Sequence, residues 1–188
     1  MTTDEIMQVF RDTGALLEGH FILRSGLHSR QYFQCALALQ HMPTVEKLGA
    51  ELARKARPLG AVTVVSPAMG GLVLGQEVAR QLGVRFIFVE KEEGKLALRR
   101  GFKIHSGEKI LIVEDVVTKG GRVQETMNIV QAHGGQLLGV AMAVDRSGGS
   151  VKFPVPMFSL IQMNVATFEP DKLPPDLAAL PAVHPGSK

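Results

Sequence analysis

The amino-acid sequence predicts an α/β fold in which a parallel β-sheet is flanked by helices. From residue 61 onward, short apolar runs alternate with amphipathic stretches, and turns that contain glycine separate them. The apolar runs do not alternate between apolar and polar residues, which is typical of strands that helices cover on both faces. The length of 188 residues fits one domain, so we expect a single domain over residues 1–188.

The N-terminal part is expected to form two helices with a pair of extended segments between them. Apolar residues recur at helical spacing near the N-terminus, and Pro43 suits the first position of a second helix. Between these helices, residues 19–35 form two short extended pieces around a turn at residues 25–26.

Five apolar runs then carry the expected strands, and two amphipathic stretches carry the helices between them. The strand segments are residues 61–66, 84–90, 110–113, 137–144 and 158–163. The helical segments are residues 71–83 and 121–133. Residues 164–188 contain five of the ten prolines, which predicts a loose or surface-docked tail.

Composition excludes several classes of protein. The formal net charge of +3 is small and the basic residues form no long run, so we expect no nucleic-acid partner. A single cysteine, Cys35, allows no intramolecular disulfide and is typical of a reducing compartment. The sequence shows no signal peptide and no apolar run near the ~20 residues of a membrane span. We therefore expect a cytoplasmic protein that does not bind membranes.

The most informative stretch is residues 110–122, ILIVEDVVTKGGR. Its apolar run leads directly into two acids, Glu114 and Asp115, which can accept hydrogen bonds from sugar hydroxyls or lie beside magnesium. Gly120 and Gly121 follow and open a helix, where free backbone N–H groups bind anions.

Three further side chains suit the same anion site. Thr118 adds a hydroxyl, and Lys119 and Arg122 add positive charge. A phosphorylated sugar would satisfy both the acids and the glycine turn, whereas a turn with solvated acids is the plainer alternative. Neither the Walker pattern nor G-x-G-x-x-G is present, which argues against those nucleotide sites.

Loops at the carboxyl ends of parallel strands meet at one edge of the sheet. We therefore expect four loops to converge there: residues 66–71, the loop after residue 90, residues 114–122 and residues 145–149.

An apolar strand, two acids, two apolar residues, Thr and a glycine turn resemble the phosphoribosyl-pyrophosphate motif of type I phosphoribosyltransferases. Four other segments, in order, resemble the orotate phosphoribosyltransferase family in its shorter form, and the likeness covers about residues 10–150. They are GALLEGHFILRSGLHS (14–29), SPAMGG (66–71), EKEEGKLALRRGF (90–102) and VDRSGG (144–149).

The resemblance implies a type I phosphoribosyltransferase-like sheet with a small N-terminal hood to which residues 1–40 contribute. It implies transfer of ribose 5-phosphate from phosphoribosyl pyrophosphate to orotate, giving orotidine 5′-monophosphate and pyrophosphate in pyrimidine (UMP) biosynthesis. Magnesium is the implied cofactor, carried by the substrate, with Asp115 as the one candidate side-chain ligand. A homodimer that shares the charged loop 90–100 between subunits is also implied.

The resemblance also assigns roles to residues. Glu114 and Asp115 would hold the ribose hydroxyls, and Thr118 and Arg146 would contact orotate. The implied binding residues for the rest of phosphoribosyl pyrophosphate are Arg24, Ala68, Met69, Lys91, Val116, Val117, Thr118, Lys119, Gly120, Gly121 and Arg122. The Ala68–Met69 bond is the candidate for a cis peptide that relatives carry.

Lys91, Lys95 and Asp115 are the implied catalytic residues, with Arg99 and Arg100 as weaker candidates. The charged loop departs from the better-known pattern, because it lacks the histidine that relatives usually carry. Plainer alternatives stay open: the charged loop as a solvated loop, Arg24 as an exposed hairpin residue, and Arg146 as an ion-pair partner near Asp145.

Two other functions remain as alternatives. A purine phosphoribosyltransferase would keep residues 114–122 but would not need Arg146 for a carboxylate. A non-catalytic regulator that binds phosphoribosyl pyrophosphate usually adds a basic patch or a DNA-binding domain, and the sequence contains neither.

Overall fold

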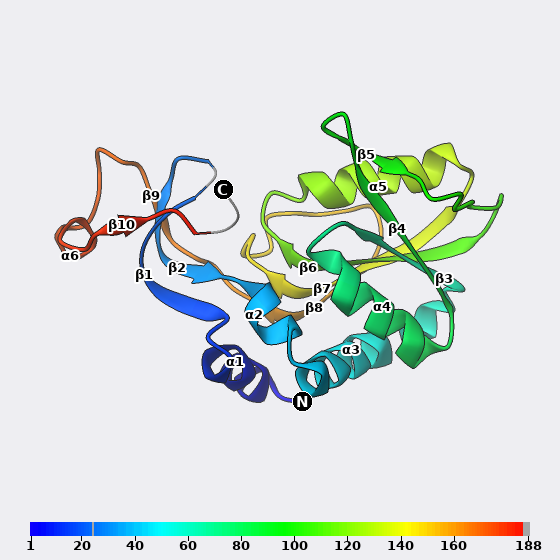
Figure 1. Ribbon diagram of the computed structural model, residues 1–188, viewed down its shortest axis with the longest axis horizontal. Coiled ribbons are helices and arrows are strands. Elements are labelled where there is room, and N and C mark those ends of the chain that lie inside the picture. The colour runs from blue at the N-terminus through cyan, green and yellow to red at the C-terminus, as the bar shows by residue number, and fades with distance from the viewer. Residues whose placement is uncertain (24, 186–188) are drawn as a thin grey trace.

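The computed structural model describes residues 1–23 and 25–185, and Figure 1 shows two sheets side by side. The larger sheet has six strands in the order β5-β4-β3-β6-β7-β8, and the smaller has four in the order β10-β1-β2-β9. The predicted binding residue Arg24 lies outside the described residues. Among those described, no helix is long and apolar enough to cross a membrane.

The helices and strands have the following bounds. The helices are α1 (Thr3–Asp12), α2 (Cys35–Leu39), α3 (Met42–Ala56), the 3-10 helix η1 (Arg57–Leu59), α4 (Gly71–Leu82), α5 (Gly121–Ala132) and α6 (Pro175–Ala178). The strands are β1 (Leu16–Ile22), β2 (His28–Phe33), β3 (Thr63–Pro67), β4 (Arg85–Glu92), β5 (Lys95–Leu98), β6 (Lys109–Val117), β7 (Gln136–Asp145), β8 (Met157–Gln162), β9 (Thr167–Phe168) and β10 (Ala182–Val183).

The six-stranded sheet confirms the predicted α/β class. Strands β3, β4, β6, β7 and β8 run parallel, and only β5 is antiparallel to its neighbour. In Figure 1 helices α3 and α4 lie on one face of the sheet and α5 on the other. Along β6, Leu111 and Val113 pack in the core cluster on the α3 and α4 side, whereas Ile112 packs in the cluster with Met127 of α5. Both faces are covered, which explains why the strand sequences are apolar throughout.

The four-stranded sheet, which we call the hood, joins the two ends of the chain. Strands β1 and β2 form the antiparallel pair expected from residues 19–35. The proline-rich tail is not loose along residues 167–183, because β10 pairs with β1 and β9 pairs with β2. Leu177 of α6 is buried, and Arg30 of β2 donates hydrogen bonds to both carboxylate oxygens of Asp176.

The charged segment 90–100 was expected to be a loop, but most of it forms a β-hairpin. Strand β4 continues to Glu92, and β5 returns antiparallel to it after a two-residue turn. Both turn residues, Glu93 (φ 50°) and Gly94 (φ 87°), have positive φ, as the type I′ hairpin turn requires at both positions. Leu96 is buried while Lys95 is exposed, and this alternation is the signal that sequence reasoning missed.

Candidate active site

Three of the four loops expected to converge, those after β3, β6 and β7, meet at the carboxyl edge of the large sheet. The Arg122 guanidinium donates to the carbonyl oxygen of Ala68, which joins the loop after β6 to the loop after β3. The Arg146 N–H donates to the Val117 carbonyl oxygen at 2.8 Å, which joins the loop after β7 to the end of β6. A Cβ atom built on Gly70 would lie 2.6 Å from Asp115 Oδ1, so the loop after β3 passes directly over this carboxylate.

The glycine turn before α5 has the geometry of an anion site. Gly120 has φ 74°, a conformation that favours glycine, and the first hydrogen bond of the helix runs from the Gln124 N–H to the Gly120 carbonyl. The N–H groups of the first helical turn therefore lack intrahelical partners. The side chains of Thr118, Lys119 and Arg122 are exposed around this turn. The arrangement can bind a phosphate through backbone and side-chain donors together.

Glu114 and Asp115 differ in environment although they are adjacent. Glu114 is 2% exposed and its Oε1 accepts a hydrogen bond from the Asp115 N–H at 3.0 Å. Burial, and then the negative charge of Asp115, raise the pKa of the Glu114 carboxyl well above its ordinary value. Asp115 is half-buried and its Oδ1 accepts from the Val116 N–H. Asp115 is therefore the more accessible carboxylate for a sugar hydroxyl or a cation.

The predicted binding residues Val116 and Val117 can contribute backbone groups to the site rather than side chains. Val117 is 2% exposed and packs beside α5, and its carbonyl is already used by the Arg146 N–H. Val116 is half-buried on the α3 and α4 side. The structure therefore places the Val117 side chain in the core rather than against a ligand.

The loop after β3 carries the expected unusual bond, since the Ala68–Met69 peptide is cis. The Ala68 N–H donates to the Val89 carbonyl at 2.7 Å, and the Ala68 carbonyl accepts from Arg122. Met69 is 78% exposed. This loop therefore lies between β4 and the glycine turn, with the Met69 side chain exposed to solvent.

Arg146 is partly buried at the boundary between the large sheet and the hood. Its Nε is buried with no hydrogen-bond partner among the described residues, and it forms no salt bridge there. The neighbouring Asp145 carboxylate accepts instead from the N–H and hydroxyl of Ser147, at 2.8 and 2.6 Å. Burial lowers the pKa of the Arg146 guanidinium. An unpaired guanidinium in such a place suits a carboxylate ligand, because two of its N–H groups can pair with two oxygens.

The hairpin β4–β5 separates the basic candidates into two groups. Arg99 pairs with Glu92 at 3.0 Å and Arg100 with Glu90 at 2.6 Å, so these charges are compensated within the hairpin. Lys91 and Lys95 are exposed, and neither makes a salt bridge within residues 1–23 and 25–185. The structure does not bring these lysines into contact with the glycine turn.

The donors at this edge fit a magnesium ion that takes most of its ligands from a substrate. The described residues contain no group of three or more His, Cys, Asp or Glu side chains that could hold a metal. One open carboxylate, Asp115, faces the space left by the absent side chain of Gly70. Magnesium bound through one or two carboxylates plus phosphate oxygens is the arrangement that this set allows.

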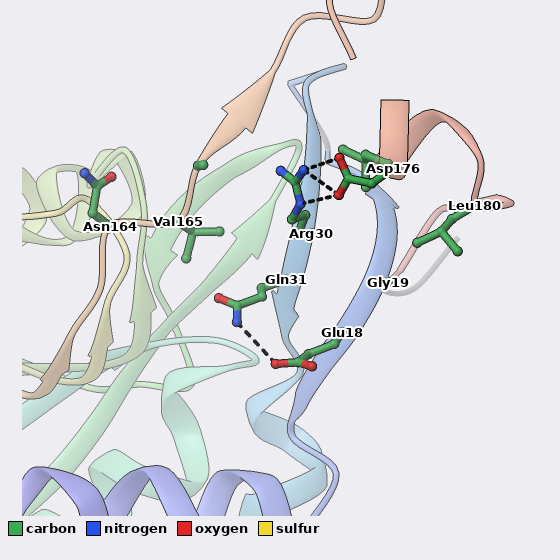
Figure 2. Close-up of a pocket in the computed structure, with 10 residues that line it drawn as sticks. Glu18, Gly19, Arg30, Gln31, Asn164, Val165, Asp176 and Leu180 are labelled. Carbon is green, nitrogen blue, oxygen red and sulfur yellow. Dashed lines mark hydrogen bonds and ion pairs between the residues drawn. The ribbon is translucent and has the colours of Figure 1, made fainter. Parts of the chain in front are cut away.

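A pocket of about 500 Å³ lies in the hood, and no predicted site residue lines it (Figure 2). Arg30 and Asp176 form their ion pair at one side of it, and Gln31 donates to Glu18 at another, at 3.5 Å. The wall of this pocket is partly apolar, which is consistent with a place where the tail packs on the hood. The chemistry of residues 114–122 belongs to the sheet edge instead, because Asp115, the glycine turn and Arg146 lie there.

The chain belongs to the phosphoribosyl transferase family, since the model of the phosphoribosyl transferase domain matches residues 36–171 and the fold and site agree with it. It is 48% identical over 188 residues to the orotate phosphoribosyltransferase of Desulforamulus reducens, covering 100% of this chain and 98% of the relative. It is also 48% identical to the orotate phosphoribosyltransferase of Chlorobaculum parvum, covering 100% and 97% of the two chains. Among solved structures, the orotate phosphoribosyltransferase of Aeropyrum pernix has a TM-score of 0.71 at 21% identity, covering 84% of this chain and 93% of that chain.

Sequence reasoning missed three residues that the structure places at functional elements. Tyr32 of β2 has its ring centroid 5.8 Å from the Arg146 guanidinium carbon, and Gly70 lies over Asp115. Glu125 of α5 contacts the hairpin β4–β5. Gly70 lies within the segment SPAMGG (66–71) but was assigned no role there, and no short motif marks Tyr32 or Glu125. Each of the three contacts joins segments far apart in the sequence.

Proposed function

We propose that this protein is an orotate phosphoribosyltransferase, which transfers ribose 5-phosphate from phosphoribosyl pyrophosphate to orotate in pyrimidine nucleotide biosynthesis. The observation that carries the proposal is the unpaired Arg146 guanidinium at the same sheet edge as the glycine turn. A purine base has no carboxylate for this group to bind. The names of the full-length relatives support the same substrate.

The reaction would proceed largely through electrostatics. The glycine turn, with Thr118, Lys119 and Arg122, would hold the 5-phosphate, and Asp115 would accept hydrogen bonds from the ribose hydroxyls. As the bond from C1 to the pyrophosphate oxygen breaks, positive charge develops on the ribose, and the orotate N1 forms the new bond to C1. Lys91 and Lys95 would stabilise the departing pyrophosphate, because preorganised positive charge matches negative charge as it develops.

Magnesium is the proposed cofactor, and it would neutralise pyrophosphate oxygens when bound. Asp115 is the side chain that would hold it, with the remaining ligands from the substrate. Arg146 and Thr118 would orient orotate so that N1 faces C1, and closure of the hairpin would exclude water from the ribosyl cation.

We also propose a cytoplasmic homodimer in which the hairpin reaches the partner's site. Two apolar side chains near the start of α4, Met69 and Val73, are exposed, and they suit burial against a second copy. A mixture of inactive Lys91→Ala and Arg146→Ala subunits tests this directly. Activity recovered on mixing would support a shared site, whereas a monomer by light scattering would rule it out.

The test of the function is loss of orotate absorbance in the presence of phosphoribosyl pyrophosphate and magnesium. Adenine, hypoxanthine, xanthine and uracil serve as alternative acceptors, and we expect none to react. Arg146→Ala should lower kcat/KM for orotate about 100-fold, because truncating one partner of a buried charge pair is costly. Arg11→Ala, an exposed arginine on α1, is the matched control.

The alternatives give different results in the same assay. Turnover of a purine base, unaffected by Arg146→Ala, would place the protein in the purine branch. Tight binding of phosphoribosyl pyrophosphate without turnover of any base would indicate a regulator.

A further inference from the structure

Glu125 connects the helix of the phosphate site to the hairpin that carries the unpaired lysines. Its Oε1 accepts a hydrogen bond from the Leu96 backbone N–H at 2.6 Å. Glu125 lies about one turn into α5, which begins at Gly121, and Leu96 lies in β5. Figure 1 shows α5 next to β5, the edge strand of the large sheet.

This hydrogen bond uses a backbone group that the sheet does not pair. Strand β5 is the edge of the six-stranded sheet and has β4 as its one neighbour. Free N–H groups on an edge strand need another partner or water. Here the partner is a carboxylate, which makes the bond charge-assisted and stronger than a bond between neutral groups.

The side chain of Leu96 is held at the same place. It is 7% exposed and packs in one cluster with Val130 of α5, Ile104 and the strand residues Val89 and Ile87. Backbone and side chain of Leu96 are therefore both fixed, the first by Glu125 and the second by apolar packing. The rest of the hairpin tip, from Lys91 to Lys95, is exposed.

Leu96 is also the hairpin residue nearest in register to both lysines. It pairs with Lys91 across the two strands and follows Lys95 in the chain. The arginines beyond it are neutralised by Glu90 and Glu92, so Lys91 and Lys95 carry the free positive charge of the hairpin. A contact that fixes Leu96 fixes the base from which these two side chains extend.

We propose that Glu125 is a positioning residue, which anchors the hairpin to α5 and so sets where Lys91 and Lys95 present their charge to the departing pyrophosphate. This inference rests on the proposed function. Glu125 itself is not proposed to touch the substrate. It acts through the Leu96 amide, and the same helix presents its N-terminus to the 5-phosphate.

The experiment compares Glu125→Ala with Glu125→Gln, which keeps an acceptor oxygen at the same position. Gln124→Ala, at an exposed neighbouring position on α5, is the matched control. Two quantities are measured: hydrogen exchange of the Leu96 amide, and kcat with KM for each substrate. A hydrogen bond to a charged group corresponds to about tenfold or more in an equilibrium. We therefore expect Glu125→Ala to speed exchange and lower kcat each by about tenfold, with KM for orotate unchanged.

Glu125→Gln should recover most of both effects, and Gln124→Ala should show neither. The proposal is overturned if exchange at Leu96 does not change in Glu125→Ala, or if it changes while kcat stays at the wild-type value. It is equally overturned if Gln fails to rescue although the thermal midpoint is normal. Absence of turnover in the wild-type protein would instead refute the proposed function, and the exchange of Leu96 would still report whether the anchor exists.

Discussion

The guanidinium carbon of Arg146 lies 5.8 Å from the centre of the Tyr32 ring, across the boundary between the large sheet and the hood. Tyr32 is itself supported by Phe21, whose ring centroid lies 6.0 Å away. The hood thus provides an aromatic face for a cation whose Nε has no partner among the described residues. A cation over an aromatic ring is held in place while its N–H edge stays free for a carboxylate.

We predict that Tyr32→Leu raises KM for orotate about fivefold, because it removes the aromatic face that orients Arg146. Tyr32→Phe keeps that face and should leave KM near the wild-type value. KM for phosphoribosyl pyrophosphate should not change in either variant. Equal losses in Leu and Phe variants would mean that the hydroxyl, and not the ring, is what matters.

A second prediction concerns Gly70 and Asp115. A Cβ atom at Gly70 would lie 2.6 and 2.7 Å from the two carboxylate oxygens of Asp115, which is too close for the side chain to stay in place. Gly70→Ala should therefore raise KM for phosphoribosyl pyrophosphate about tenfold by displacing Asp115. If the effect runs through that carboxylate, Gly70→Ala should add little to Asp115→Asn in the double variant. Additive losses would contradict this route.

The central sheet and the phosphate site were predictable because their signals are local. Buried parallel strands are continuous apolar runs, and the acids, Thr118 and the glycine pair directly follow the apolar run at residues 110–113, although β6 itself continues to Val117. The fold class then brings the loops after β3, β6 and β7 to one edge without any knowledge of side-chain contacts.

What the sequence did not predict depends on contacts between distant segments. Strand β10 has two residues and pairs with β1 about 160 positions earlier, so its sequence carries no periodic signal. Tyr32 and Arg146, like Leu96 and Glu125, meet only after the sheets have formed. The hairpin β4–β5 is different, because its signal is local and was available in the sequence. Gly94 lies in a two-residue turn, and Lys95 and the buried Leu96 follow it directly.

A third prediction follows from the burial of Glu114, which raises the pKa of its carboxyl above the ordinary value of 4.5. A raised folded-state pKa means that the folded protein retains a proton that the unfolded chain has lost. Stability from this group is therefore complete below the unfolded pKa and declines as pH rises from there toward the folded pKa.

Glu114→Gln removes this dependence, because the amide cannot ionise. The thermal midpoint of the variant relative to the wild type should rise as pH increases from the ordinary carboxyl value of 4.5 to neutral pH. Glu51→Gln is the control of opposite sign. A hydrogen bond from Arg54 lowers the pKa of Glu51 to about 2, so its contribution is complete above the ordinary value of 4.5 and is lost as pH falls from there through about 2. The difference in thermal midpoint between Glu51→Gln and the wild type should stay constant over the same pH interval. If the difference in thermal midpoint between Glu114→Gln and the wild type also stays constant with pH, the pKa of the Glu114 carboxyl is not raised.

The last prediction separates two ways in which the tail is held on the hood. Leu177 is 1% exposed, whereas the side chains of Asp176 and Arg30 are 67% and 43% exposed. Leu177→Ala should lower the free energy of unfolding by about 2–5 kcal/mol, because the substitution removes most of a buried side chain and leaves a cavity. Asp176→Asn should change it little, since solvent and salt screen exposed ion pairs. Hydrogen exchange locates the effect: Leu177→Ala should speed exchange in β1 and β10 and leave β6 protected, because α6 contacts β1 of the hood whereas β6 lies in the large sheet. An equal loss from Asp176→Asn would mean that the ion pair, rather than apolar burial, fixes the tail.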